Sequence, residues 1–187
     1  MPRLRAEKIP EVKLETDEIS LRLEQYDDIF SDFDIRPYSS RALSVDFLEE
    51  IKRAALDKDD GGVEVFLHMP KKLRDKKNES IIAERLVAHF RKHYHLALEQ
   101  KKKVKRMGFL MILFGVVSMF LATFVMYKNP GHNFLYSFLV IFLEPAAWFL
   151  WWEGADQIIF TAKKLDPQLD FYRKMSHTSG HINFESY

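Results

Sequence analysis

The chain has 187 residues, 47% of them hydrophobic and 29% charged, with a net charge of +1 and no cysteine. The missing cysteine excludes disulfides, thiolate zinc sites and thiol nucleophiles. The charges are segregated, because residues 107–152 carry only two charged side chains and the other 141 residues carry 53. This distribution excludes a simple globular protein and predicts a polar domain with a membrane anchor.

The amino-terminal part of the chain has the sequence patterns of a small folded domain. Apolar residues alternate in two bursts within residues 9–24, which predicts a β-hairpin. Ser44 is suited to cap a helix that follows it. A turn at residues 57–62 then precedes residues 63–69, where strict alternation of apolar and other side chains predicts a strand.

A second helix is expected to begin at Asn78 or Ser80, both of them good capping residues. No helix breaker separates it from the apolar segment that starts at residue 107, so we expect it to continue into that segment. The predicted order is β-β-α-β-α, and residues 1–100 are assigned to a cytoplasmic α+β domain. Its sheet edges would be completed by partner subunits or by a membrane surface.

Two apolar stretches, residues 107–127 and 134–152, are each long enough to cross the ~30 Å hydrocarbon core of a bilayer as a helix. The turn formers between them leave room only for an antiparallel hairpin. Residues 101–160 are therefore assigned to a basic juxtamembrane stretch and a transmembrane hairpin. Basic residues flank its outer ends, so the positive-inside rule predicts cytoplasmic termini and a multi-pass protein of an inner or plasma membrane. No cleavable signal peptide is expected.

The ends of the hairpin carry residues typical of a membrane interface. Trp148, Trp151 and Trp152 crowd the predicted cytoplasmic end of the second span, as an aromatic belt does. Contact with anionic lipid headgroups explains the basic residues before the first span. These residues are Lys101, Lys102, Lys103, Lys105 and Arg106. No glycine-rich phosphate loop or aromatic-interleaved strand motif accompanies the basic residues, so nucleic acid is not an expected partner.

The first span also carries a stripe of small residues. Gly108, Gly115 and Ala122 recur every seven residues, a spacing that suits close contact with another helix. Ala147 lies on the face of the second span that also carries the acidic residue of that span. Ser118 falls within the stripe, at about the depth of the only acidic residue in the spans when the ends of the hairpin are matched.

That acidic residue is Glu144, and Pro145 follows it directly. A carboxyl near the middle of a span is costly and is by default a functional hypothesis. Pro145 leaves the carbonyl of Ile141 without its helical partner, which predicts a kink. One interpretation is an ion or proton pathway lined by Glu144 in an oligomer. The favoured interpretation is a protonated Glu144 that hydrogen-bonds to Ser118 or to a neighbouring subunit.

The sequence Asp32-Phe33-Asp34 has the paired aspartates of enzymes that form an aspartyl-phosphate. The residues before it are too acidic for a central strand and the domain is too small, so we favour a loop instead. The aromatic side chains of this region, Tyr26, Phe30, Phe33 and Tyr38, are expected to pack on the core while its acids are solvated. Arg36 and Arg41 are candidate partners for those acids.

His89 and His93 have the helical spacing of a metal-binding pair, but no third ligand stands at the usual spacing. We therefore predict no metal, no cofactor and no catalytic residues. The basic loop at residues 71–77 is assigned to lipid headgroups, with a small anionic ligand as the alternative.

Residues 161–187 are expected to form a short amphipathic helix, with Asp166 as its N-cap and Pro167 as its first residue, and then a loose tail from Ser176 onward. The favoured function is a non-enzymatic, self-associating scaffold or interaction subunit, a homo-oligomer whose copies meet through the small-residue and Glu144 faces. The alternatives are a channel or transport subunit and a membrane receptor for a small anionic ligand.

Overall fold

The computed structural model describes residues 18–56, 63–128, 133–176 and 182–187. It combines helices with a small three-stranded parallel sheet, and two of its helices are long and apolar enough to cross a membrane. The chain divides into two compact units. We call Met1–Phe90 with Arg173–Tyr187 the sheet unit, and Arg91–Tyr172 the hairpin unit.

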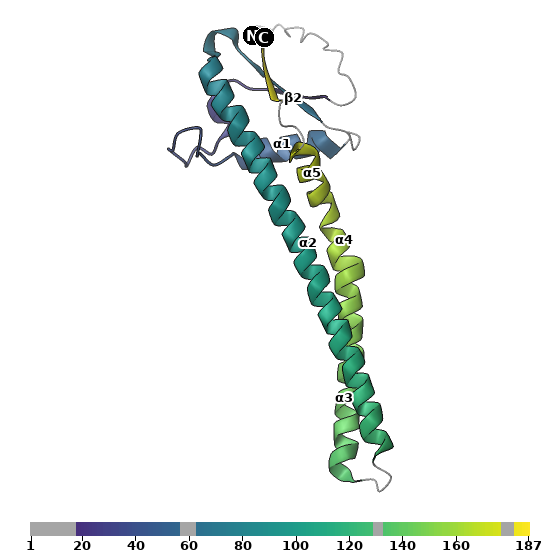
Figure 1. The fold of residues 1–187 in the computed structure, drawn as a ribbon. Coiled ribbons are helices and arrows are strands. Elements are labelled where there is room, and N and C mark those ends of the chain that lie inside the picture. The colour runs from purple at the N-terminus through teal and green to yellow at the C-terminus, as the bar shows by residue number, and fades with distance from the viewer. Residues whose placement is uncertain (1–17, 57–62, 129–132, 177–181) are drawn as a thin grey trace, which may run out of the picture. The chain divides into compact units, whose positions relative to one another are not determined.

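The sheet has the order β1-β2-β3, and both pairs of neighbours are parallel (Figure 1). Its strands are β1 (Glu18–Arg22), β2 (Glu64–Met69) and β3 (Ile182–Ser186). The prediction of a loose tail is wrong for the end of the chain, because β3 pairs along its whole length with β2. The alternation of Ile182 and Phe184 with polar neighbours is the sequence signal for this strand. The segment becomes a strand because β2 lies beside it and supplies its backbone hydrogen bonds.

Parallel pairing gives the chain two crossover connections. Helix α1 (Val45–Leu56) lies between β1 and β2, and everything from α2 to α5 lies between β2 and β3. The second burst of the predicted β-hairpin is β1, and its described neighbour is β2. The first burst lies outside the described residues. Parallel strands run in the same direction, so the chain must return from the end of one strand to the start of the next. A short turn cannot span that distance, and a crossover is required.

The core of the sheet unit lies on one face of β2, where Val65, Leu67 and Met69 are buried. The turn after β1, η1 (Tyr26–Ile29), adds buried side chains, and Phe30 pairs with Leu43 in an isolated antiparallel bridge. Ser44 precedes α1 as expected. The remaining large buried side chains come from α1, from the first four turns of α2 and from α5, and include Phe47, Ile51, Ile82, Leu86, Phe90 and Met175.

Helix α2 (Lys76–Tyr127) runs without interruption for 52 residues. It begins earlier than predicted, because Asp75 caps it in place of Asn78 or Ser80. The Asp75 carboxylate accepts from Lys77 N at 2.9 Å, and the Asp75 carbonyl accepts from Glu79 N at 2.9 Å. A short turn, η2 (Lys71–Leu73), connects β2 to this cap.

The second long helix starts at α3 (Phe134–Asp156), where the Asn133 side chain accepts from Leu135 N. It continues through a π-helical segment, η3 (Gln157–Thr161), into α4 (Ala162–Lys164). Figure 1 shows α2 and α3 antiparallel and side by side. The most apolar windows of the two long helices are 11% and 6% buried, so most of their side chains lie on the surface of the chain. The amphipathic helix α5 (Asp166–Ser176) follows as expected.

Candidate functional site

Small residues form the contact between α2 and α3. A Cβ atom added to Gly108 would lie 2.7 Å from the carbonyl oxygen of Gly154, and one added to Gly115 would lie 2.9 Å from that of Ala147. Ala122 and Ala147 are 5% and 0% exposed. The two backbones approach so closely that no larger side chain fits at the glycines. This surface is therefore occupied within a single chain.

Glu144 lies beside that contact and outside it. Its side chain is exposed, as is that of Pro145, which lies inside α3. Ser118 on α2 is half-buried, and no hydrogen bond joins it to Glu144 among the described residues. The structure therefore brings the small residues together but leaves the carboxyl on the outer surface of an apolar helix, with exposed Ile141 and Phe142 beside it.

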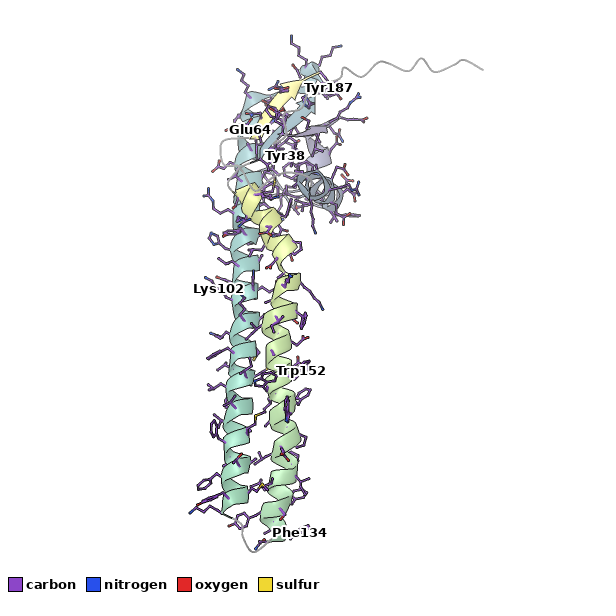
Figure 2. All side chains as sticks on the ribbon, turned by 90° about the vertical axis from the view of Figure 1, so that its right-hand side faces the viewer. Tyr38, Glu64, Lys102, Phe134, Trp152 and Tyr187 are labelled. Atoms are coloured by element: carbon purple, nitrogen blue, oxygen red, sulfur yellow. The ribbon has the colours of Figure 1, made fainter. Side chains whose placement is uncertain are left out.

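The tryptophans of α3 form a cluster near the carboxyl end of that helix, and Figure 2 labels one of them, Trp152. Trp148 and Trp151 meet edge to face with ring centroids 5.8 Å apart, and the rings of Trp151 and Trp152 lie 6.2 Å apart. Trp148 and Trp152 are 59% and 66% exposed. Rings with an apolar body and an N–H donor are suited to the interface between hydrocarbon and water.

The basic stretch before the first apolar segment divides into two roles. Lys102, Lys103, Lys105 and Arg106 are exposed on α2. Lys101 is half-buried, and its ammonium group pairs with the Asp166 carboxylate at the start of α5. Four of the five predicted headgroup contacts thus remain accessible, while Lys101 joins two helices of the hairpin unit.

Two side chains of the π-helical segment η3 donate hydrogen bonds to the acidic residues that precede it. Gln157 Nε2 donates to Glu153 Oε1 at 3.0 Å, and Thr161 Oγ1 donates to Asp156 Oδ2 at 3.2 Å. Both acids are half-buried. Such segments often mark functional positions, because the wider turn redirects side chains. No pattern in the sequence predicts it.

The most buried ionic cluster of the sheet unit surrounds Glu79, which is 8% exposed. Arg74 Nε donates to Glu79 Oε1 at 2.7 Å, Arg74 Nη2 donates to Oε2 at 3.0 Å, and Tyr26 OH donates to Oε1 at 3.1 Å. The Arg74 guanidinium holds the pKa of Glu79 below its ordinary value. Asp75 N donates to Tyr26 OH at 2.8 Å, so the cluster fastens η1 to the start of α2.

The loop at residues 31–42 is organised by Asp34. This carboxylate accepts from Ala42 N at 2.7 Å and from Arg36 Nε and Nη2 at 2.9 and 2.7 Å, and the guanidinium lowers the pKa of Asp34. The two arginines pair with acids of the loop as predicted, Arg36 with Asp34 and Arg41 with Asp27. The expectation that the acids are solvated is wrong for Asp34, whose side chain is 14% exposed.

The expectation that Phe33 packs on the core is wrong. Phe33 and Ile35 are each 99% exposed, because the side chain of the intervening Asp34 turns into the loop. Tyr26 and Phe30 are buried as expected, and Tyr38 stacks on Phe30 with ring centroids 5.1 Å apart.

A shallow surface pocket of about 460 Å³ lies between this loop and the first turns of α2. It is lined by Asp27, Arg36, Pro37, Tyr38, Ser39, Arg41, Asn78 and Ile81. Both of its guanidinium groups already pair with carboxylates, so the pocket offers little uncompensated charge to an anionic ligand.

The histidines do not converge on a metal site within the described residues. No group of three or more His, Asp or Glu side chains there is placed to hold an ion. His93 stacks on Tyr172 with ring centroids 5.3 Å apart. His177 and His181 lie outside the described residues.

Comparisons with protein-family models, with curated proteins and with solved structures find no match for this chain.

Proposed function

We propose that this chain is a non-enzymatic integral membrane protein, in which a helical hairpin anchors a small mixed helix–sheet domain and copies associate within the bilayer through α3. Its role is that of a scaffold or interaction subunit. The observation that carries the proposal is the position of Glu144, an exposed carboxyl on a helix whose apolar window is 6% buried.

A carboxyl group at this depth costs about 2.5–3.5 kcal/mol per helix when lipid surrounds it. A hydrogen-bonding partner offsets that cost, and a second copy presents the same carboxyl at the same depth. Gly108 and Gly115 are already covered by α3 of their own chain. The small-residue stripe is therefore unavailable to a second copy, and the Glu144 face remains for association.

The orientation in the bilayer follows from the exposed charges. Lys102, Lys103, Lys105 and Arg106 precede the first span, and Lys163 and Lys164 follow the second, whereas the apolar ends approach a turn with only Lys128. By the positive-inside rule the sheet unit and both termini face the cytoplasm of a cell with an inner or plasma membrane. The four basic residues on α2 contact anionic headgroups there.

The test is the mass of the complex in lipid nanodiscs and in mild detergent. We expect the wild type to be an oligomer, Glu144→Gln to remain one because its amide still forms hydrogen bonds across copies, and Glu144→Leu to shift towards the monomer. The matched control is Phe142→Leu, which changes an exposed apolar side chain two residues away. A monomeric wild type, or an unchanged mass for Glu144→Leu, contradicts the proposal.

A channel or transport subunit is the second candidate, and Pro145 is the observation that favours it. The proline has no N–H, so the carbonyl of Ile141 lacks its helical partner and adds a polar group beside Glu144. In this case Glu144→Gln leaves the oligomer intact but abolishes ion or proton flux into liposomes. Wild-type liposomes with no flux above protein-free liposomes exclude the candidate.

A further inference from the structure

Two of the most exposed apolar side chains in the described part of the chain lie on one loop. Phe33 and Ile35, which we call the apolar tip, are each 99% exposed. Single exposed apolar residues are common on protein surfaces, but a pair of large side chains held fully in water is a feature of interaction sites.

The loop holds the apolar tip in a fixed position. Ser31 N donates to the Ala42 carbonyl at 2.9 Å and closes the loop, while the Asp34 carboxylate accepts from Ala42 N at 2.7 Å. Arg36 adds two guanidinium bonds to the same carboxylate. Since the side chain between Phe33 and Ile35 is anchored, both apolar groups are prevented from folding inward. A partner that binds the tip therefore has little loop entropy to remove.

The charge around the tip indicates the chemistry of that partner. Residues 24–36 carry five carboxylates and one guanidinium, a net charge of −4, which becomes −3 when Arg41, the partner of Asp27, is included. An anionic bilayer would repel this segment, whereas a cationic surface with an exposed apolar group would attract it.

The chain itself has such a surface. Residues 71–77, which we call the cationic segment, carry five basic side chains and one carboxylate, a net charge of +4, which becomes +3 when Glu79, the partner of Arg74, is included. Within it Leu73 is 53% exposed at the end of η2. The two segments therefore have net charges of equal magnitude and opposite sign, and each segment exposes at least one apolar side chain.

The two segments are also neighbours in the sheet unit. The surface pocket is bordered by Arg36 from the loop and by Asn78 from the turn that follows the cationic segment. Tyr26 OH binds Asp75 N, which joins η1 to the cationic segment directly. A surface with complementary halves side by side is self-complementary under a two-fold rotation, and this is the requirement for an isologous dimer.

We propose that the sheet units of two copies dock on each other, with the apolar tip of each copy seated on Leu73 and the cationic segment of the other. The occupant of the tip is thus a second copy of this chain. The contact uses neither Glu144 nor any other residue of the spans, and it is independent of the proposed association within the bilayer.

The absence of cysteine makes disulfide cross-linking a clean test, performed on the full chain in native membranes. Two copies with different tags, one Phe33→Cys and the other Leu73→Cys, are co-expressed and oxidised. We expect a cross-linked heterodimer, because docking brings the two Cα atoms within the ~7 Å that a disulfide requires. The control pairs Phe33→Cys with Lys52→Cys, an exposed position on α1. Cross-linking no stronger than that control overturns the proposal.

A double substitution tests the same contact from the other side. Phe33→Lys with Ile35→Lys puts like charge against the cationic segment of the other copy. It changes side chains that touch little in their own chain, so folding is kept. Assayed as competitor copies that carry no cysteine, it should need about 100-fold more protein than the wild type to suppress the cross-link. Equal competition by the two proteins overturns the proposal.

Two further arms separate this contact from the other possibilities. In a Glu144→Leu background the cross-link should persist, whereas its loss would show that proximity depends on the bilayer contact and would overturn the proposal. A fluorophore on Phe33→Cys that is quenched by brominated lipid in nanodiscs would assign the tip to the membrane and overturn it as well. If the cross-link fails while Glu144 still controls the oligomer mass, only the docking of sheet units is wrong.

Discussion

Replacing Arg74 with methionine probes the buried ionic cluster at the start of α2. The substitution keeps most of the aliphatic stem and removes the guanidinium that donates to both oxygens of Glu79, at 2.7 and 3.0 Å. What remains is a carboxylate whose residue is 8% exposed and whose described donor is the hydroxyl of Tyr26 at 3.1 Å.

The size of the effect follows from the burial of the pair. Removing one partner of a fully buried ion pair costs about 3–5 kcal/mol, because an uncompensated charge is left behind. The side chains of Arg74 and Glu79 are 27% and 11% exposed, so water reaches part of the pair and lowers the cost. We expect about 2–3 kcal/mol, which is a roughly 30- to 150-fold increase in the population of the open state.

Hydrogen exchange of the β2 amides measures this opening directly in the full chain. These amides are bonded to β1 on one side and to β3 on the other, so they exchange when the sheet unit opens. The control is Arg53→Met, which removes an ion pair to Glu50 with side chains 74% and 55% exposed. Pairs that exposed contribute about 0–1 kcal/mol.

Acid should shrink the difference between Arg74→Met and the wild type. The folded-state pKa of Glu79 is lowered from 4.5, so the stability it contributes is complete above that value and is lost as the pH falls through the lowered one. In the variant, protonation also removes the cost of the buried charge. An Arg74→Met effect equal to that of Arg53→Met, or one that grows between pH 7 and pH 4, would refute the reasoning.

Two further predictions concern the helix contact and the last strand. Gly154→Leu should separate α3 from α2, because its Cβ would lie 2.5 Å from the Gly108 carbonyl oxygen. We expect the free energy of unfolding to fall by about 1–3 kcal/mol, measured by thermal unfolding with tryptophan emission as the signal. The exposed control Phe149→Leu should change it little. Ending the chain at Ser176 removes β3, which should abolish hydrogen-exchange protection of the β3-facing amides of β2 and promote aggregation through the exposed edge. The control Asn183→Ala should do neither. Unchanged protection in the truncated chain would show that β3 is dispensable.

The long helices could be predicted from the sequence alone, since each is specified locally. The run of apolar residues and the lack of a breaker before residue 107 are sufficient for a continuous α2. The start of that helix was misplaced by a few residues, because Asn78, Ser80 and Asp75 are all good caps and the choice depends on where Tyr26 binds. Helix ends are decided by such contacts and not by propensity.

The sequence predicts which residues belong to the candidate site, but it does not predict how they are arranged. The recurrence of small residues every seven positions in α2 indicates a contact surface, but the sequence does not say whether the partner is the same chain. The periodicity also failed to separate Glu144 from Ala147, which lie three residues apart on α3 and have opposite exposure. The outward position of Phe33 depends on hydrogen bonds from Arg36 and Ala42 to Asp34, which no local pattern encodes.

The segregation of charge by itself determined that this chain has a polar part and an apolar helical part, because a run of apolar residues in helices is a local property. Only the tertiary structure decided that the last residues return to the sheet as β3, far along the chain from β2. A strand acquires its identity from the neighbour with which it exchanges backbone hydrogen bonds. That neighbour is chosen by the fold, and no window of sequence around Ile182–Ser186 contains it.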